Sequence, residues 1–473
     1  MTSLPPIDSL LHANPDLKAL RDPADHGTYV QDWRGLARGE TPAVLLPAST
    51  DQVQAIVKWA SQHQVALVPR GGGSGLVVGS IPTGQSQVVV SLERMNSVLD
   101  LDTASPSITV QAGCVLGQVK AQAKQAGLLF PPSFGSQDSC QIGGNLATNA
   151  GGKNALRYGS MRAQVQGIEA VLPDGSLYWD LDGLIKDNRG YDLKQLFVGS
   201  EGTLGIITAA CLRLYPQPVD HATFYATTPS AQHAIQVLGA LRAVVGDAVT
   251  SFELIGPTAL GLVQEHSKLA KLPLAHDAAN PYAIIGEVSL FAGAAAIAEH
   301  INAALVEQIE QGNLGDIVLA SSSAQRDAMW LVREETVHCQ RAAGASIKHD
   351  VSVPIAKLPQ LLERGEAIMR DLVPGCRPCP FGHVGDGNLH FNCAPPPGMP
   401  NDAFLAFAKP MQAQIFDLVD QLGGSFSAEH GIGSLKIHDL ETRLPPANYQ
   451  LMRAIKQTLD PQNIMNPGKV FPD

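Results

Sequence analysis

The sequence lacks several features that mark particular classes of protein. Charged residues make up only 16% of its 473 residues, and 44 acidic residues outnumber 33 basic ones. Because no cluster of Lys and Arg interrupts this acidic balance, we expect no nucleic-acid partner. The longest apolar run, from 283 to 298, is broken by Glu287, so we expect no membrane span. The N-terminus has no basic head before an apolar core, so we expect no secretory signal.

Cysteine is also scarce, with seven residues scattered along the chain. An odd number of scattered cysteines favours reduced thiols and therefore a cytoplasmic location. One Cys-x-x-Cys pair, Cys376 and Cys379, precedes His383 and Cys393 and allows a zinc-knuckle interpretation. A single pair without a second is a weak signal, so reduced structural cysteines are the preferred interpretation.

The composition that remains is apolar and rich in loops. Apolar residues reach 45%, and the chain contains 45 glycines and 33 prolines without a repeat or a low-complexity period. The length predicts two or three domains. Pro216 and Pro218 mark a boundary, so we expect a first domain over 1–218 with its core at about 40–215. A second domain over 219–425 and a C-terminal segment over 426–473 follow it.

Local patterns predict the main elements. Ser49 and Gln52 fit a capping box at the start of a helix, because apolar residues then recur at helical spacing. The other elements expected in the first half are strands at 65–68, 88–92, 107–111 and 205–214, a helix at 115–126 and a hairpin around 173–175. The second half is expected to be α+β, with helices at 230–244, 291–311, 324–342, 357–371 and 402–422, strands at 249–255, 282–290, 316–320 and 346–353, and one helix in the last 45 residues.

Three glycine clusters stand out in the first half, at 70–75, 142–152 and 199–205. Glycine lets backbone N–H groups approach a phosphate closely, although any one cluster alone is better interpreted as a tight turn. None of them completes Gly-x-x-x-x-Gly-Lys-Ser/Thr, because Asn154 follows Lys153. None completes Gly-x-Gly-x-x-Gly either, because Leu76 and Val78 occupy the positions of the third glycine. A P-loop NTPase and a Rossmann dehydrogenase therefore both lack their signatures.

Taken together in order and spacing, the three clusters resemble the FAD domain of the vanillyl-alcohol-oxidase flavoprotein family. The matching segments read Pro-Arg-Gly-Gly-Gly-Ser-Gly-Leu at 69–76, Ile-Gly-Gly-Asn-Leu-Ala-Thr-Asn-Ala-Gly-Gly at 142–152 and Gly-Ser-Glu-Gly-Thr-Leu-Gly-Ile-Ile-Thr at 199–208. The resemblance implies that the 70–75 loop holds the FAD pyrophosphate and that the C-terminal segment returns to the first domain. Because no histidine occurs between Arg70 and Ser80, we expect non-covalent FAD.

The resemblance carries FAD contacts onto a defined set of positions. They are Pro69, Arg70, Gly71, Gly72, Gly73, Ser74, Gly75, Leu76, Pro132, Ser133, Gly135, Ser136, Ile142, Gly143, Gly144, Asn145, Thr148, Asn149, Ala150, Gly151, Gly152, Tyr158, Glu201, Gly202, Gly205, Ile206, Ile207 and Asn466.

A histidine constellation lies between residues 382 and 392 of the second half. Asp386-Gly387 is a strong signal for a two-residue hairpin, which would place His383 directly opposite His390. Two neutral imidazoles at that distance can bind one divalent metal, and Glu429 is the candidate for a third ligand. His430 would then remain available for acid–base chemistry. A hairpin whose histidines are satisfied by local hydrogen bonds remains the alternative interpretation.

The segments His-Val-Gly-Asp-Gly-Asn-Leu-His at 383–390 and Ala-Glu-His-Gly-Ile-Gly at 428–433 also resemble a known pattern. It belongs to the C-terminal domain of FAD-dependent D-2-hydroxyacid dehydrogenases, the D-2-hydroxyglutarate and D-lactate group. With the first half, the resemblance covers nearly the whole chain from about residue 40. It implies an α+β fold, with a vanillyl-alcohol-oxidase-type (PCMH-type) FAD-binding domain and a ferredoxin-like α+β substrate (cap) domain.

The same resemblance implies roles for individual residues. The metal ligands are His383, His390 and Glu429 holding zinc or manganese, the catalytic base is His430, and the substrate contacts are Arg333, Lys348 and Asn392. There is one departure, because the D-2-hydroxyglutarate branch has a threonine where this chain has Val337, with Thr336 beside it. Without the resemblance, Arg333 and Lys348 would be interpreted as ordinary surface charges.

The expected activity is oxidation of a D-2-hydroxyacid to the 2-oxoacid, with D-2-hydroxyglutarate as the preferred substrate. D-Lactate or glycolate is the alternative within the family. A metal-dependent hydrolase and a non-catalytic flavin-binding module are the alternatives outside it. The electron acceptor is expected to be an electron-transfer flavoprotein or a quinone. A homodimer is expected only because it is the commonest oligomer.

Overall fold

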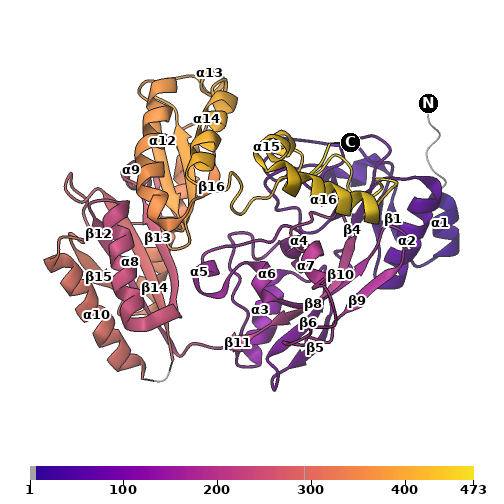
Figure 1. Ribbon diagram of the computed structural model, residues 1–473, viewed down its shortest axis with the longest axis horizontal. Coiled ribbons are helices and arrows are strands. Elements are labelled where there is room, and N and C mark those ends of the chain that lie inside the picture. The colour runs from indigo at the N-terminus through magenta and orange to yellow at the C-terminus, as the bar shows by residue number, and fades with distance from the viewer. Residues whose placement is uncertain (1–6, 292, 473) are drawn as a thin grey trace. The chain divides into compact units, whose positions relative to one another are not determined.

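The computed structural model describes residues 7–291 and 293–472, and the chain forms two compact units (Figure 1). The first unit contains Met1–Gly152, Gly159–Gln217 and Glu429–Asp473, and the second contains Lys153–Tyr158 and Pro218–Ala428. The short segment Lys153–Tyr158 was expected in the first domain but belongs to the second unit. Its helix α5 (Ala155–Tyr158) packs on strand β13 (Val249–Ile255), and Ser251 of that strand donates a hydrogen bond to the carbonyl of Lys153.

The first unit contains a four-stranded sheet that carries the first glycine-rich loop. Its strands, in spatial order, are β1 (Lys18–Leu20), β2 (Val44–Leu46), β4 (Val88–Ser91) and β3 (Leu67–Arg70). β4 runs parallel to both β2 and β3, while β1 is antiparallel to β2. Pro69 fits inside β3 because β3 is the edge strand, where a missing N–H costs no ladder hydrogen bond.

A five-stranded antiparallel sheet forms the other half of this unit. Its spatial order is β5 (Val98–Asp102), β6 (Ser107–Gln111), β10 (Ile206–Arg213), β8 (Val165–Val171) and β9 (Leu177–Asp180). The hairpin between β8 and β9 turns where the sequence predicts, with Gly175 at φ +81°. A separate pair joins β7 (Leu128–Leu129) to β11 (Tyr215–Pro216).

The helices of the first unit are α1 (Ile7–Ala13), α2 (Thr50–His63), α3 (Leu116–Gln125), α4 (Ile142–Ala147), α6 (Met161–Gln164), α7 (Lys194–Phe197), α15 (Ile437–Arg443) and α16 (Pro446–Leu459). The predicted cap of α2 is confirmed, because the Ser49 hydroxyl accepts a hydrogen bond from the Gln52 N–H. The expectation of a single helix in the last 45 residues was wrong. Pro445 and Pro446 separate α15 from α16, since proline cannot continue a helix.

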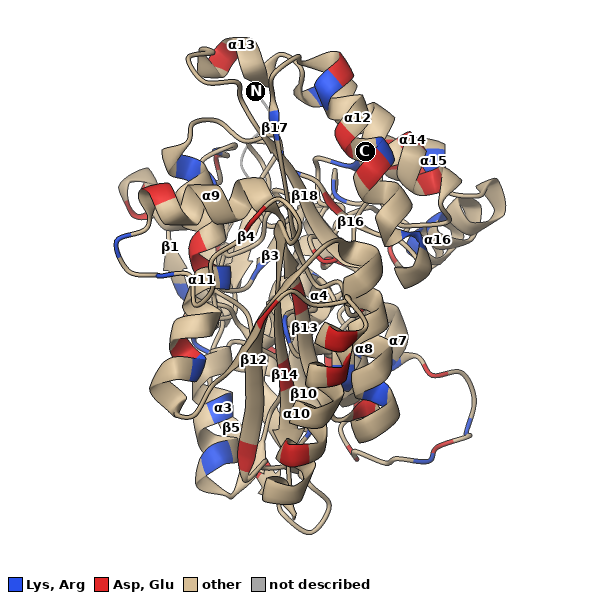
Figure 2. Cartoon of the chain, turned by 90° about the vertical axis from the view of Figure 1, so that its left-hand side faces the viewer, with Lys and Arg blue, Asp and Glu red and all other residues tan. Residues whose placement is uncertain are grey.

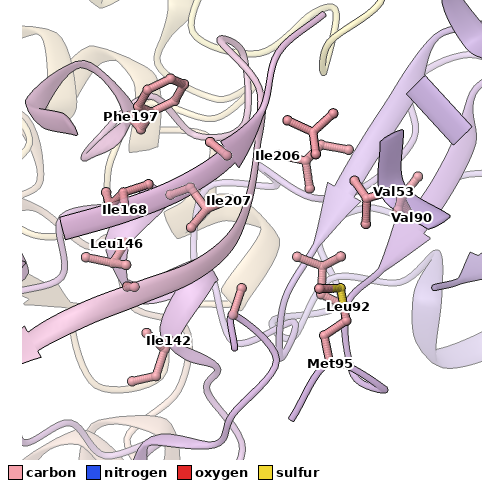
Figure 3. Close-up of a cluster of buried hydrophobic side chains, with 14 of the residues drawn as sticks. Val53, Val90, Leu92, Met95, Ile142, Leu146, Ile168, Phe197, Ile206 and Ile207 are labelled. Atoms are coloured by element: carbon pink, nitrogen blue, oxygen red, sulfur yellow. The ribbon is translucent and has the colours of Figure 1, made fainter. Parts of the chain in front are cut away.

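One hydrophobic core unites both sheets of the first unit with their helices (Figure 3). Val53 from α2, Val90 from β4, Ile142 from α4, Ile168 from β8 and Ile206 from β10 all contribute to it. Helix α4, which belongs to the second glycine cluster, is therefore fixed by packing against strand β10, which follows the third cluster.

The second unit is built on a seven-stranded sheet in which every neighbouring pair is antiparallel. The spatial order is β15 (Ile317–Leu319), β12 (Asp220–Thr228), β14 (Tyr282–Leu290), β13 (Val249–Ile255), β17 (Arg377–Gly382), β18 (Asn388–Ala394) and β16 (Asp350–Ser352). Along the chain, the first four strands of that order are the fourth, first, third and second, which is the ferredoxin-like arrangement. Three further strands extend the sheet at the β13 edge.

Helices cover both faces of this sheet. The helices are α8 (Ala231–Val245), α9 (Pro257–His266), α10 (Ala294–Glu310), α11 (Ser323–Ala342), α12 (Leu358–Leu372), α13 (Asn401–Leu405) and α14 (Ala408–Gln421). Figure 2 shows α9 and α11 on one side of strands β12 to β14 and α8 and α10 on the other. Helix α9 was not predicted, and one helix was predicted where the structure has α13 and α14. Pro410 prevents a continuous helix there, because its ring would clash with the carbonyl of Ala406.

Candidate active site

The glycine-rich loop after β3 presents a row of unused backbone donors. Among the described residues, none accepts a hydrogen bond from the backbone N–H groups of Gly71 to Gly75. A Cβ atom at Gly72 would lie 2.0 Å from the carbonyl oxygen of Ser139, so this position tolerates no side chain. Successive free N–H groups in a turn form a concavity that suits a phosphate. The loop therefore fits the pyrophosphate of a dinucleotide cofactor such as FAD.

The residues that flank this loop anchor it. The buried guanidinium of Arg70 donates to the carbonyl of Thr28 at 2.6 Å and to the hydroxyl of Ser80 at 3.4 Å. The carbonyl of Leu76 accepts a hydrogen bond from Arg34 at 3.3 Å. The side chain of Arg70 is thus committed to the protein, and its contribution to the loop is to hold it in place.

The second glycine cluster opens with helix α4 and closes against an earlier loop. Ile142, Gly143, Gly144 and Asn145 belong to α4, while Pro132, Ser133, Gly135 and Ser136 lie in the connection between β7 and α4. Gly152 has φ +100°, and a Cβ atom there would lie 2.4 Å from the Ser133 carbonyl. Close backbone approach therefore explains the glycine at this position.

Past α4, the residues expected to contact FAD divide between the two units. Thr148, Asn149, Ala150 and Gly151 follow α4 in the first unit, and Tyr158 belongs to the second. Asn149 has φ +49°, and its side-chain carbonyl accepts from the Ser160 hydroxyl and the Arg162 N–H. Asn149 thus shapes the turn after α4 with its own side chain.

Glu201, in the third cluster, turns its side chain into the first unit. Its carboxylate oxygens accept hydrogen bonds from the backbone N–H groups of Ile432 at 2.7 Å and Gly433 at 2.8 Å. Its backbone carbonyl accepts from the side-chain amide of Asn466 at 2.7 Å. Burial raises the pKa of Glu201, and the two N–H donors oppose that rise. Glu201 thereby ties the 199–205 turn to the segment that carries Glu429 and His430.

The rest of the third cluster leads into the core. Gly202 and Gly205 have φ values of +74° and +154°, and Ile206 and Ile207 begin strand β10 as buried residues. These glycines allow the chain to reverse directly before a strand that lies in the centre of its sheet.

Glu429 and His430 begin the C-terminal part of the first unit, and both are half-buried. One carboxylate oxygen of Glu429 accepts a hydrogen bond from the Gly152 N–H at 2.8 Å. Gly431 and Gly433 have φ values of +82° and +54°. The segment is therefore a glycine-supported turn that the carboxylate of Glu201 holds from one side.

The loop between β17 and β18 in the second unit corrects the predicted hairpin. The structure pairs His390 with Phe381, not with His383, and residues 383–387 form the connection. The Gly385 N–H donates to the carbonyl of Phe252 on β13, so the connection is tied to a neighbouring strand instead of closing as a two-residue turn. The rings of His383 and His390 nevertheless lie close together, with their centroids 5.7 Å apart.

A buried carboxylate that the sequence analysis missed lies beside these histidines. Glu253, in the middle of β13, is 1% exposed. One of its oxygens is 2.5 Å from Nδ1 of His383, and the other accepts from Nε of Arg333 at 2.7 Å. Burial alone would raise the pKa of Glu253, but the adjacent His383 and Arg333 hold that pKa below its ordinary value. The signal in the sequence was a single charged residue in an otherwise uncharged strand.

His390 and Asn392 share one face of β18, because they are two residues apart on a strand. Nδ1 of His390 is 3.9 Å from a carboxylate oxygen of Asp350, which the sequence analysis also missed. The amide nitrogen of Asn392 donates to Gln340 at 2.9 Å, and its oxygen accepts from the His349 N–H at 3.3 Å. The side chain of Asn392 is thus fixed by α11 and by the chain beside β18.

The expected substrate-binding cations lie in the same unit as these histidines. Arg333, on α11, stacks over the ring of Phe381 at 4.7 Å. Lys348 is half-buried and lies two residues before the start of β16. Val337, one helical turn after Arg333, packs against an apolar cluster that includes Val332 and Cys339. The position where the resemblance expects a threonine is therefore part of the hydrophobic packing of α11.

A second buried carboxylate lies on the same sheet face as Glu253. Glu287 of β14 accepts two hydrogen bonds from Arg326, at 2.7 and 2.9 Å, and one each from Trp330 and Thr223. Because Arg326, Trp330 and Arg333 recur at helical spacing, α11 presents one polar stripe to the sheet. Glu287, which interrupts the longest apolar run of the sequence, thus anchors α11 to the sheet.

Two protein families match this chain. Residues 41–180 match the family described as FAD binding domain, and residues 217–470 match the family of FAD linked oxidases, C-terminal domain. D-2-hydroxyglutarate dehydrogenase of Xanthomonas citri pv. viticola is 38% identical over 99% of this chain and 97% of its own length. The mitochondrial D-2-hydroxyglutarate dehydrogenase of Bos taurus is 34% identical over 96% of this chain and 81% of its own length.

The fold is also similar to solved structures. The structure of p-cresol methylhydroxylase with substrate bound superposes with a TM-score of 0.76 at 16% identity, covering 99% of this chain and 96% of that one. At this identity the likeness shows the fold alone, and it confirms the predicted PCMH-type fold. None of the described helices combines the length and the apolarity needed to cross a bilayer. With its extended match to the curated relatives, the chain belongs to the FAD-linked oxidase family that includes these dehydrogenases, and it is an FAD-dependent oxidoreductase.

Proposed function

We propose that the protein oxidises a D-2-hydroxyacid to the 2-oxoacid, with D-2-hydroxyglutarate as the substrate. The observation that carries this proposal is the similarity, along nearly the whole chain, to proteins named D-2-hydroxyglutarate dehydrogenase. The unused N–H groups of the 71–75 loop support FAD as the cofactor. Bound non-covalently, FAD would accept the hydride released from C2 of the substrate.

We further propose that His383, His390 and Glu429 bind a divalent metal, zinc or manganese. Imidazole and carboxylate are donors that both ions accept. The spacing of the two imidazole rings, 5.7 Å between centroids, supports their part in the ligand set. A bound metal would act as a Lewis acid that lowers the pKa of the substrate hydroxyl.

The remaining roles are those that the resemblance to the D-2-hydroxyacid dehydrogenases implies, and side-chain chemistry supports them. His430 takes the hydroxyl proton as general base, which an imidazole can do near neutral pH. Arg333 offers a planar fork to a substrate carboxylate, Lys348 offers a point charge, and Asn392 supplies an amide contact. No described residue accepts a hydrogen bond from the terminal nitrogens of Arg333, so they remain available for that carboxylate.

Val337 supports a second candidate substrate. Val337 itself offers no hydroxyl, and the hydroxyl of the adjacent Thr336 is used by the Arg333 carbonyl at 2.6 Å. This favours a substrate without a second carboxylate, namely D-lactate or glycolate. The two candidates share one mechanism and differ only in what surrounds the distal end of the substrate.

Other features of the setting are also proposals. The seven cysteines are free thiols, which suits a reducing compartment such as the cytoplasm. An electron-transfer flavoprotein or a quinone would reoxidise the flavin, and a homodimer is the proposed assembly.

The test is the visible spectrum of the purified protein, recorded before and after adding D-2-hydroxyglutarate, D-lactate or D-malate without oxygen. We expect oxidised flavin bands that bleach fastest with D-2-hydroxyglutarate. Fastest bleaching by D-lactate would move the assignment to the second candidate. Flavin that stays oxidised with all three acids would refute both.

A further inference from the structure

Glu253 is the buried group whose surroundings carry an inference beyond the proposed reaction. It lies on β13 between Phe252 and Leu254 and is 1% exposed. An unpaired carboxylate in such a place is strongly destabilising, so its two partners must satisfy it. Those partners are one proposed metal ligand, His383, and one proposed substrate ligand, Arg333.

The short contact with Glu253 favours a proton on one nitrogen of His383. The Glu253 carboxylate has only acceptors, so a contact of 2.5 Å with Nδ1 is favourable when Nδ1 carries a proton. In a neutral imidazole the lone pair then lies on Nε2, and Nε2 is the atom that can serve as a metal ligand. A carboxylate behind a ligating histidine fixes the tautomer and orients the ring.

The second oxygen of Glu253 orients the guanidinium of Arg333. It engages Nε, which is on the inner side of the guanidinium, at 2.7 Å. The Phe381 ring supports the flat face of the same group. The two terminal nitrogens are consequently presented as a pair, the arrangement that binds a carboxylate in bidentate fashion.

We propose that Glu253 is a positioning residue that orients the metal ligand His383 and the substrate ligand Arg333 together through its two oxygens. The proposal rests on the function proposed above. It adds that the metal site and the carboxylate site share one buried support and are impaired together when that support is altered.

Glu253→Gln is the sharpest test, because glutamine has nearly the same shape but only one acceptor. If its oxygen faces His383, its NH₂ group faces the Nε–H of Arg333, donor against donor. If it flips, its NH₂ group faces Nδ1 of His383, so the proton moves to Nε2 and blocks metal binding. Either orientation breaks one of the two arrangements.

The chain offers a matched control in Glu287→Gln. Glu287 is also buried on the same sheet face and is also held by an arginine of α11, Arg326, but it contacts neither His383 nor Arg333. Both variants thus lose a buried carboxylate, but only Glu253→Gln loses the connection between His383 and Arg333.

The experiment measures Zn²⁺ binding to the FAD-loaded protein by calorimetric titration, together with KM for D-2-hydroxyglutarate. We expect Glu253→Gln to bind Zn²⁺ about 10- to 100-fold more weakly and to raise KM, as loss of a partner behind a metal ligand does. Glu287→Gln should bind Zn²⁺ as the wild type does. Should Glu253→Gln fail to fold, Glu253→Asp keeps the charge on a side chain too short to span both partners, and the same loss of affinity is expected.

Two results would overturn the inference, and they are distinguishable. If the wild type binds Zn²⁺ and oxidises the substrate, and Glu253→Gln and Glu253→Asp match it in both measurements, only the role of Glu253 is wrong. If the wild type binds no Zn²⁺, the metal part of the proposed function fails and this inference fails with it.

Discussion

Glu201→Gln is expected to destabilise the first unit and to slow the reaction, because one carboxylate holds the turn that follows His430. Both oxygens of Glu201 accept backbone hydrogen bonds, at 2.7 and 2.8 Å, in a buried setting. Glutamine keeps one acceptor and places an NH₂ group against the other N–H. Since a hydrogen bond to a charged group contributes about 1.5–3 kcal/mol, the free energy of unfolding should fall by about that amount.

The effect on the reaction comes from His430, which lies two residues before Ile432. Ile432, whose N–H binds Glu201, follows His430 by two positions, and Gly431 between them has a positive φ. A turn that loses one of its two anchors lets the His430 ring move, and a displacement of about 1 Å at a reacting group costs up to about 100-fold in rate. We therefore expect flavin reduction to slow by about one to two orders of magnitude.

The assay combines denaturant unfolding of the FAD-loaded protein with stopped-flow flavin reduction. Glu169→Gln is the control in the same unit, because one oxygen of Glu169 accepts from the hydroxyls of both Thr50 and Thr208 and a glutamine oxygen can retain both. The FAD content of each variant is read from its visible band, which separates loss of cofactor from loss of positioning. A Glu201→Gln protein that is as stable and as fast as Glu169→Gln would refute the reasoning.

Three further outcomes are expected. Burial alone would raise the pKa of Glu287, but Arg326 lowers it from 4.5 to about 2. The ionised carboxylate therefore stabilises the folded state by about 3 kcal/mol above pH 4.5. This stabilisation is lost as the pH falls towards 2. The stability difference between wild type and Glu287→Gln should accordingly shrink on acidification, and a difference independent of pH would contradict this. His430→Ala should slow flavin reduction about 100-fold or more while zinc content measured by atomic absorption stays unchanged, and equal loss of metal would make His430 a ligand instead. Asp460→Asn should cost about 3–5 kcal/mol in denaturant unfolding, because the buried ammonium of Lys456 loses its ionic partner, and a change below about 1 kcal/mol would contradict that estimate.

Local signals predicted the elements well wherever short-range chemistry determined them. Strands β13 and β14 begin and end where the sequence places them, and α2 begins at its predicted cap. The predicted hairpin at Asp386-Gly387 failed for a tertiary reason. The Gly385 N–H bonds to β13, and Asp386 accepts from the Asn388 N–H, so the turn is longer than its two central residues suggest.

The candidate site likewise contains residues that local sequence signals predict and residues that come together only through tertiary contacts. Histidines in a glycine-rich setting are visible in the sequence because their own neighbours are unusual. The buried carboxylate beside them is not, since Glu253 lies on β13, far along the chain from His383, and meets it only in the folded sheet. A sequence pattern therefore brings out candidate histidines more readily than the buried carboxylate that contacts one of them.

Isolated carboxylates in apolar segments nevertheless carry usable information in this chain. Only 16% of its residues are charged, and burying a lone carboxylate is expensive, so such a residue persists only where partners neutralise or bond it. Glu253 and Glu287 interrupt apolar strands, and Glu201 interrupts a glycine-rich turn. Each of them proves to join elements that are distant in the sequence, through an arginine, a histidine or a pair of backbone N–H groups. In a chain so poor in charge, an acidic residue among apolar or glycine neighbours is thus a reason to look for a structural junction.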